Sequence, residues 1–184
     1  MIVIALHVVA CLMLCDLLTG IGHWVEDTYG HLGMADAIRR FIVLDNIQHH
    51  RRPATILRGS WWECNRVLLI PCTAIALLCA ATGITAWQVY FVLAVSSQSN
   101  HIHRWAHTAA IPDWVAVLQS FGLLQSRKHH AVHHQSPYAV RFCTVTNYLN
   151  PVLDRIGFWR VLERIVQSAF GVPVRRATAA REGY

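Results

Sequence analysis

The sequence predicts an all-α integral membrane protein with three transmembrane helices, further interfacial or re-entrant helices, and a histidine-rich site for two metal ions at the cytoplasmic face. Of its 184 residues, 54% are hydrophobic and 14% are charged, whereas about 25% of the residues are charged in soluble domains. None of its 16 Lys and Arg residues lies in residues 1–38 or 67–103, and most of its 12 histidines lie in short groups. Three or four bilayer segments would account for most of the apolar residues, which favours a single domain.

The first apolar run, residues 1–18, is long enough to cross about 30 Å of hydrocarbon as a helix. It has no basic residue at its start and no small-x-small cleavage site, so a cleaved signal peptide is disfavoured. We expect an anchor with its N-terminus outside. Asp16 lies near the inner end, where a carboxylate is either functional or close enough to the interface to reach water.

Residues 67–100 carry no charge, and Arg66 and Arg104 flank them. A single long helix would place these arginines on opposite sides of the membrane, whereas a hairpin places them on the same side. We therefore expect a hairpin that is broken near Thr82 and Gly83. Because basic loops face the cytoplasm, both basic regions should lie on that side. A basic face would also attract an acidic protein or anionic lipid.

Two shorter helices are predicted further along the chain. Pro112 and Asp113 indicate a helix start, and the apolar residues that follow at helical spacing are too few for a full span, which favours an interfacial or re-entrant helix. Beyond Pro151, apolar residues recur near helical spacing between arginines. This pattern predicts a basic amphipathic helix on the membrane, with Gly157 weakening its first turn. We expect the tail, residues 175–184, to be disordered.

The histidine groups predict a metal site. His130, His133 and His134 stand at positions i, i+3 and i+4, which share one face of a helix with Cβ atoms about 5–6 Å apart, and His103 and His107 repeat the i, i+4 spacing. With both basic regions on one side, eight imidazoles fall at the same membrane face. The predicted metal ligands are His23, His49, His50, His103, His107, His130, His133 and His134. We expect no ligand role for His7, His31, His101 and His129.

An all-histidine set of this size favours a redox or oxygen-activating metal pair, since structural zinc sites usually include cysteine. The six cysteines form no C-x-x-C pair, and the motifs H-R-W-A-H and H-A-V-H-H lack the glutamate base of hydrolytic zinc enzymes. Asp27 follows His23 by four residues and either hydrogen-bonds a ligand imidazole or caps a helix or turn. Nucleic-acid binding is not expected, because the arginines follow the membrane edges.

These residues resemble the small membrane lipid desaturases that include the Kua/CarF plasmanylethanolamine desaturases and the plant chloroplast enzyme that makes a trans-3 double bond in the palmitoyl chain of phosphatidylglycerol. The resemblance runs from about Asp16 to Val174. Its landmarks are D-L-L-T-G-I-G-H-W-V-E-D-T-Y-G at 16–30, H-H-R-R-P-A-T-I-L-R at 49–58, H-R-W-A-H at 103–107, L-Q-S-F-G-L-L-Q-S-R-K-H-H-A-V-H-H-Q-S-P-Y at 118–138 and F-G-V-P at 170–173. His129 matches a histidine in the Kua branch alone.

The resemblance implies a lipid desaturase membrane domain over residues 1–174, in which the eight histidines hold a non-haem di-iron centre of two Fe²⁺ ions and O2 is the co-substrate. Its substrate would be an alkyl or acyl chain of a membrane lipid. Because the sequence shows no flavin or nicotinamide motif, we expect a separate electron donor of the ferredoxin or cytochrome b5 type. Four basic residues are near enough in sequence to help hold a lipid head group: Arg104, Arg127, Lys128 and Arg141.

Two alternatives remain at this point. A lipid hydroxylase would use the same centre, because desaturation and hydroxylation diverge only after the first hydrogen abstraction. A non-catalytic membrane protein that handles metal ions or binds haem would also need histidines. Ion transport, however, would require polar residues across the full membrane depth, and residues 67–100 offer few.

Overall fold

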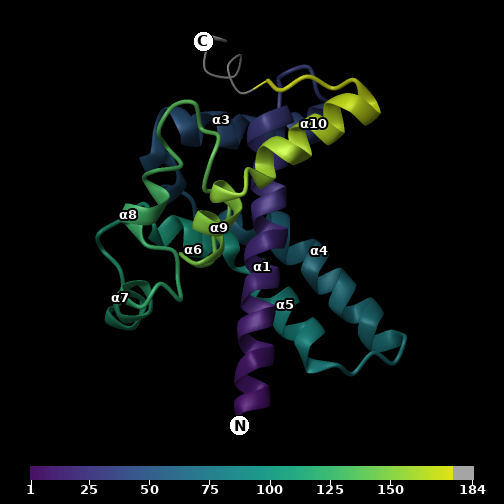
Figure 1. Cartoon of the computed structure of the whole chain (residues 1–184), viewed down its shortest axis with the longest axis vertical. Coiled ribbons are helices and arrows are strands. Elements are labelled where there is room, and N and C mark those ends of the chain that lie inside the picture. The colour runs from purple at the N-terminus through teal and green to yellow at the C-terminus, as the bar shows by residue number, and fades with distance from the viewer. Residues whose placement is uncertain (176–184) are drawn as a thin grey trace.

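The computed structural model describes residues 1–175, and within them every regular element is helical (Figure 1). The helices are α1 (Ile2–Tyr29), α2 (Asp36–Ile38), α3 (Leu44–Arg51), α4 (Trp61–Ala81), α5 (Trp87–Ser97), α6 (Ser99–Trp105), α7 (Asp113–Ser120), α8 (Arg127–His130), α9 (Leu149–Arg155) and α10 (Phe158–Phe170). A π-helical turn, Arg39–Val43, joins α2 to α3, and a 3-10 turn, Pro53–Leu57, follows α3. The all-helical prediction is confirmed.

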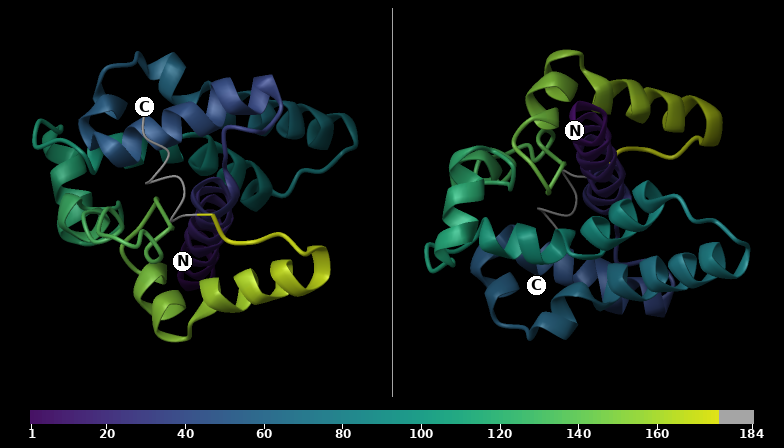
Figure 2. Two further views of the ribbon diagram at one scale, coloured as in Figure 1. Left: turned by 90° about the horizontal axis from the view of Figure 1, so that it is seen from above. Right: turned by 90° about the horizontal axis from the view of Figure 1, so that it is seen from below.

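The other elements are arranged around α1. Seen end-on, it has α9 and α10 on one side and the helices from α3 to α6 on the other (Figure 2). The helix has 28 residues, about 42 Å at 1.5 Å per residue, and so exceeds the ~30 Å hydrocarbon layer. The predicted apolar run, residues 1–18, is therefore only the first part of this helix. The helix continues past residue 18 to Tyr29 and carries His23 and Asp27 beyond the apolar part.

Helices α4 and α5 form the predicted hairpin, and its break lies where the sequence placed it. A capping box between Ser60 and Glu63 begins α4, and the chain turns after Thr82 at Gly83, whose φ of 78° favours glycine. Helices α1 and α4 are the two that are long and apolar enough to cross a membrane among the described residues, whereas α5 is a shorter apolar helix. The third transmembrane span thus stays a prediction.

The histidine-rich stretch is less helical than its spacing predicted. Helix α8 begins after Ser126, whose hydroxyl accepts the N–H of His129 at 3.3 Å, and it ends at His130. His133 and His134 lie in the turns that follow. The prediction that a single helical face presents these imidazoles is therefore wrong, although the stretch stays compact.

The C-terminal region contains two helices where the sequence predicted one. Gly157 has a φ of 67° and separates α9 from α10, so it ends one helix and begins the next. Helix α10 packs on α1 through a core of Trp24, Phe142 and Trp159. The predicted tail lies outside the described residues, except that the N–H of Arg175 donates to the carbonyl of Thr28 at 2.9 Å.

Between α8 and α9 the chain crosses the centre of the molecule without regular structure. We call residues 139–147 the buried strap. Ala139, Phe142, Cys143, Val145 and Thr146 are each at most 4% exposed. Irregular backbone at this depth requires protein partners for its polar groups, and the strap has them, as described below.

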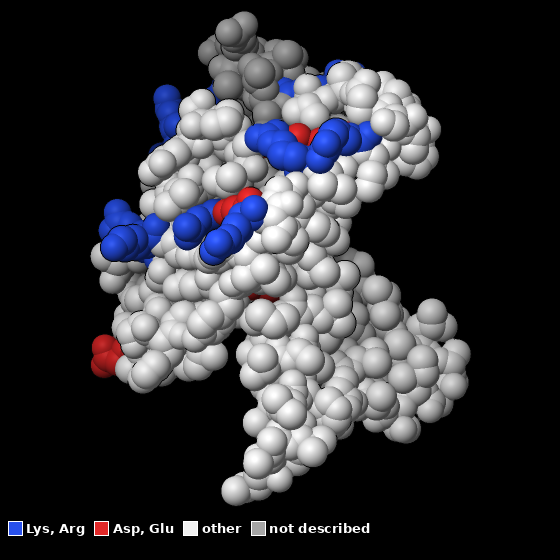
Figure 3. Space-filling model, viewed as in Figure 1, with Lys and Arg blue, Asp and Glu red and all other residues white. Residues whose placement is uncertain are grey.

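Charge divides the molecule into two parts. The face shown in Figure 3 carries its Lys and Arg side chains on the upper part, and the lower part, formed by the first half of α1 and by residues 67–97 of the α4–α5 hairpin, is free of them. Predominantly apolar side chains, among them Leu6, Val9 and Leu77, are exposed there. This surface has the composition of one that faces lipid.

Candidate metal centre

Eight of the twelve histidines come together in two neighbouring groups. In each group the potential ligand atoms lie within 4.8 Å of one another. Cluster A consists of His49, His103, His107, His130 and His134. Cluster B consists of His23, Asp27, His50 and His133. The eight are the histidines that the sequence selected, whose role as metal ligands stays a prediction.

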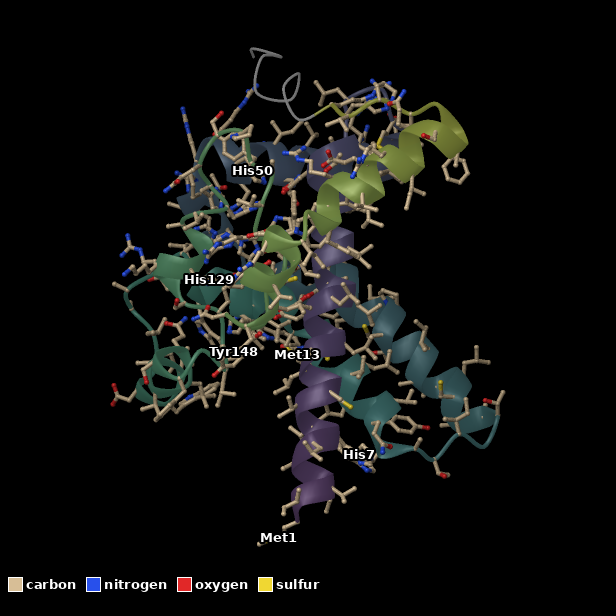
Figure 4. The ribbon with its side chains drawn as sticks, viewed as in Figure 1. Met1, His7, Met13, His50, His129 and Tyr148 are labelled. Atoms are coloured by element: carbon tan, nitrogen blue, oxygen red, sulfur yellow. The ribbon has the colours of Figure 1, made fainter. Side chains whose placement is uncertain are left out.

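Four segments far apart in the chain build the two clusters. Helix α1 supplies His23 and Asp27, α3 supplies His49 and His50, α6 and its end supply His103 and His107, and the stretch from α8 supplies the last three imidazoles. His50, at the upper end of the molecule, is labelled in Figure 4. Adjacent residues His49 and His50 go to different clusters, as do His133 and His134, so the two clusters share their supporting elements.

In cluster A the Nε2 atoms converge. His103 Nε2 lies 2.8 Å from His130 Nε2 and 3.0 Å from His107 Nε2, and His134 Nε2 lies 3.0 Å from His130 Nε2. Burial and the neighbouring imidazoles lower the pKa of His107 to about 4 and that of His134 to about 2, and they also lower the pKa of His49 and His130. These four are therefore neutral near pH 7, the form that binds metals.

In cluster B three imidazoles surround one carboxylate. Asp27 Oδ1 accepts from His50 Nε2 at 2.9 Å and from Asn46 Nδ2 at 2.8 Å. Asp27 Oδ2 lies 3.1 Å from His133 Nε2 and 3.4 Å from His23 Nε2. Asp27 stands inside α1, whose C-cap is Gly30, so it contacts imidazoles and does not cap the helix. Its position among the three Nε2 atoms also makes it a potential ligand itself.

The residues present fit two metal ions. Two imidazole nitrogens on one ion are separated by at most about 4.2 Å when each bond is about 2.1 Å, close to the spacing within each cluster. Both ring nitrogens of the buried His49 find no hydrogen-bond partner within residues 1–175. A buried polar atom without a partner is costly, and a metal ion bound in cluster A would supply a partner for one of these nitrogens. Imidazole suits iron, copper, nickel and zinc.

Backbone carbonyls orient two of the imidazoles from behind. His23 Nδ1 donates to the carbonyl of Phe142 at 3.0 Å, and His133 Nδ1 donates to the carbonyl of Val140 at 2.8 Å. The i, i+4 spacing of His23 and Asp27 indicated their contact. No signal in the sequence pointed to the two carbonyls or to Asn46, because these partners depend on the tertiary path of the strap and of α3.

The remaining four histidines lie outside both clusters. His7 lies low on α1 beside the hairpin (Figure 4), with its ring 6.3 Å from that of Trp87. His101 packs on Trp105 at 4.4 Å. His129 is buried beside cluster A, where Arg141 Nη1 lies 2.7 Å from its Nδ1.

The four basic residues considered for a lipid head group differ in their surroundings. Arg104 donates to the carbonyls of Leu57 and Gly59 at 2.8 and 2.5 Å and so fixes the connection between α3 and α4. Arg141 contacts His129 and lies 3.9 Å from Asp154. Arg127 and Lys128 are exposed beside the last three cluster histidines.

Asp16 is fully buried and therefore does not reach water. Its carboxylate accepts hydrogen bonds from the N–H groups of Val145 and Thr146, both at 2.9 Å, and from the Thr146 hydroxyl at 2.5 Å. It thus joins α1 to the strap.

The chain is similar in sequence to several known proteins. A family model described as a lipid desaturase domain matches residues 12–177. Plasmanylethanolamine desaturase 1 of Mus musculus is 34% identical over 91% of this chain and 66% of its own length. A probable fatty acid desaturase of Acanthamoeba polyphaga mimivirus is 30% identical over 92% of this chain and 86% of its own length. Fatty acid desaturase 4-like 1, chloroplastic, of Arabidopsis thaliana is 32% identical over 91% of this chain and 58% of its own length.

The chain thus spans just under two thirds of the length of the mouse relative and a smaller share of the Arabidopsis one. Among solved structures, none matches it significantly.

Proposed function

This chain belongs to the lipid desaturase domain family, and from that premise we propose that it is a membrane-bound, non-haem di-iron desaturase that introduces a C=C bond into an alkyl or acyl chain of a lipid. The observation that carries the proposal is the convergence of eight imidazoles and Asp27 into two adjacent, buried clusters. Residues 1–174 would form the desaturase membrane domain. Its eight metal ligands would be the histidines of clusters A and B, with Asp27 as an additional candidate.

Two Fe²⁺ ions held there would supply oxygen activation, in which two hydrogens leave adjacent carbons of the lipid chain, a donor supplies two electrons, the medium supplies two protons, and O2 is reduced to two waters. The protein's residues bind and orient. The five imidazoles of cluster A offer a neutral ligand set, whereas cluster B offers the carboxylate of Asp27 as well. The two ions would therefore differ in charge environment. Burial of His130 and His133, both fully inaccessible, keeps bulk water from the reacting centre.

We place the lower apolar part of the molecule in the bilayer. Helix α1 would cross with its N-terminus outside, α4 would cross beside it, and α5 together with α6 would provide the third span. Both basic regions then lie on the side of the metal centre, which is the cytoplasmic side or its equivalent under the positive-inside rule. The uncharged hairpin tip around Gly83 would lie within or beyond the opposite leaflet.

Helix α10 would lie at the membrane interface. It packs on Trp24, which stands about 33 Å from the start of α1 at 1.5 Å per residue, just beyond the ~30 Å hydrocarbon layer. Its inner face buries Trp159 and Glu163. Val161 and Ile165 are exposed on another flank, 40% and 54%. Such a helix suits the boundary between head groups and acyl chains.

Helix α7 would re-enter the membrane. It has eight residues, too few to span, and it exposes Trp114, Val117 and Phe121. In Figure 1 it lies at the level of the middle of α1, below the basic part of the molecule. An exposed aromatic face at that depth suits contact with lipid better than contact with water.

The proposed partners follow from the same chemistry. The substrate would be a membrane lipid, since the mouse and Arabidopsis relatives are named as desaturases of plasmanylethanolamine and of fatty acid. Arg127 and Lys128 are the exposed candidates for its head group. A ferredoxin or cytochrome b5 type carrier would deliver electrons, and the basic side would favour docking of such an acidic protein.

Lipid mass spectrometry on host cells tests the proposal. Cells with the intact gene are compared with cells that lack it and with cells that express His133→Ala to the same level. We expect one lipid class to become lighter by two hydrogens with the intact protein alone. A gain of one oxygen would identify a hydroxylase. Unchanged lipids, together with purified protein that binds no iron, would overturn the proposal and favour a different role for the histidines.

A further inference from the structure

We propose that the buried strap, residues 139–147, is the device that positions the ligands of cluster B, and that Asp16 holds it in place. Asp16 would act as a positioning residue about two turns below His23 on the same helix. The inference deepens the proposed function and rests on the presence of two metal ions. It concerns one of those two ions.

The first step is the attachment of the strap to α1. Asp16 is inaccessible to solvent and accepts three hydrogen bonds, two from backbone N–H groups and one from the Thr146 hydroxyl. Hydrogen bonds to a charged acceptor are the stronger kind. At the depth of a membrane span, no water is present to take the place of the carboxylate or of the two N–H groups if this contact is lost. The carboxylate therefore fixes the end of the strap.

The second step is the fixation of its middle. Asn150 pairs with Cys143 in both directions, accepting its N–H at 2.9 Å and donating to its carbonyl at 2.8 Å, and Gln125 donates to the same carbonyl at 2.6 Å. Gly20 of α1 faces this point, since a Cβ there would lie 2.8 Å from Cys143 Sγ and 3.1 Å from its Cα. Only a glycine lets the helix and the strap approach this closely.

The third step joins the strap to the metal centre. The carbonyls of Val140 and Phe142 accept the Nδ1 protons of His133 and His23. Each bond sets the tautomer, so that Nε2 of both rings is free to bind and points toward Asp27. Such partners behind a ligand orient it and tune its affinity.

The strap acts on one cluster. In cluster A, the Nδ1 atoms of His49, His130 and His134 have no hydrogen-bond partner within residues 1–175. The two strap carbonyls, of Val140 and Phe142, accept hydrogen bonds from histidines of cluster B. A change in the strap should therefore weaken the metal in cluster B by about 10- to 100-fold, the usual effect of losing a partner behind a ligand, and should leave cluster A loaded.

The test uses the full chain, purified in lipid nanodiscs and loaded with Fe²⁺, with metal content and the Co²⁺-substituted absorption spectrum as readouts. Asp16→Leu removes all three hydrogen bonds, and Thr146→Val removes only the hydroxyl donor. Thr19→Val is the matched control, because the Thr19 hydroxyl bonds only carbonyls of its own helix, at 2.9 and 3.3 Å. Asp16→Asn is the conservative variant, since its amide oxygen can still accept both N–H groups.

We expect Thr146→Val and Asp16→Leu to lose metal from one site at limiting Fe²⁺, and Thr19→Val and Asp16→Asn to keep both ions. The Co²⁺ spectrum that remains should match that of His50→Ala, which disables cluster B, and not that of His49→Ala, which disables cluster A. If Asp16→Leu does not fold, Thr146→Val decides.

Two intact sites with a parental spectrum in Thr146→Val would overturn the inference. So would loss of both ions in parallel with loss of helical content, because that result indicates a general structural role. A parent protein that binds no metal would instead overturn the proposed function itself.

Discussion

At the scale of single residues, Asp27 distinguishes the two clusters. It is 8% exposed, lies within hydrogen-bond distance of His50 and His133, and is the sole carboxylate in either cluster. Cluster A offers only neutral donors. A divalent ion in cluster B would therefore gain a direct charge interaction that cluster A lacks.

Replacing Asp27 with Asn should weaken metal binding to cluster B by at least about 10-fold and leave cluster A occupied. The amide keeps the shape of the side chain but removes its charge. Metal content after dialysis against graded chelator measures the change. Asp45→Asn, a carboxylate of α3 outside both clusters, serves as the control, and equal metal retention in the two variants would contradict the role given to Asp27.

The pKa values of the cluster A histidines predict how acid affects the metal-free chain. In the unfolded chain a histidine has a pKa near 6.5, and burial lowers that of His107 to about 4 in the folded chain. Between these values the unfolded state binds more protons, so acid favours unfolding. The free energy of unfolding is therefore unaffected by this histidine above about pH 6.5, and it decreases as the pH falls toward 4.

Thermal unfolding of the metal-free chain between pH 8 and pH 4 should show this loss, and His107→Gln, which cannot charge, should lose less stability over the same range. A Tm that does not change between pH 6.5 and 4 would contradict the assignment.

The sequence revealed the site residues by type and spacing, but it did not reveal their division. The i, i+3 and i+4 spacings, which are a local property, selected five of the eight imidazoles that the structure brings together. The other three, His23, His49 and His50, were selected by their place at the predicted membrane face of the two basic regions. Their separation into five and three, and the position of Asp27 between His50 and His133, depend on how α3 meets α1. The carbonyls of Val140 and Phe142 carry no side-chain signal at all.

At the scale of elements, the stretch after α8 shows why a regular helix was the wrong prediction. His130 and His134 belong to cluster A, whereas His133 belongs to cluster B and its Nδ1 bonds the carbonyl of Val140. A continuous helix would have put all three rings on one face. Turns after His130 allow neighbouring rings to point to different clusters.

The close contact between α1 and the strap gives a prediction at this scale. Gly20→Ala would place a methyl group 2.8 Å from Cys143 Sγ and near its backbone, so the strap must move. We expect a loss of about 1–3 kcal/mol in stability and weaker metal binding. Gly22→Ala, on the same helix with nothing within 4 Å, should be neutral or stabilising because alanine favours the helix.

Unfolding midpoints of the two glycine variants, measured side by side in nanodiscs, decide the point. Equal midpoints would contradict the tight packing of α1 on the strap.

The interfacial position proposed for α10 predicts different environments on its two flanks. Spin labels are attached to Ile165→Cys and Gln167→Cys in nanodiscs. Faster relaxation of the label by O2 reports contact with lipid, and faster relaxation by a nickel chelate reports contact with water. We expect the label at position 165, where the native Ile165 is exposed, to contact lipid, and the label at position 167 to contact water. Water at both positions would show that α10 stands away from the bilayer.

At the scale of the whole molecule, composition and charge predicted the architecture well. The all-helical class, the hairpin turn at Gly83 and the separation of a basic part from an apolar part all follow from patterns that extend over tens of residues. The number of spans does not follow so directly. The number of apolar residues suggests a third span, but α5 ends at Ser97 and α6 begins at Ser99. Whether these two short helices cross the membrane together depends on where the bilayer lies relative to the break between them.

The central claim is that two irons in clusters A and B remove two hydrogens from a lipid with O2. The most direct measurement is a single turnover of the full chain in nanodiscs made from host lipids, with iron loaded, reduced and then exposed to O2. The two reduced ions supply two electrons and the lipid supplies two, enough to convert one O2 to two waters. We predict a lipid lighter by two hydrogens in the sample that has both iron and O2, and none in samples that lack either or that carry His133→Ala. Product that forms without iron, or no product from reduced protein that holds two irons in the presence of its host lipids, would contradict the claim.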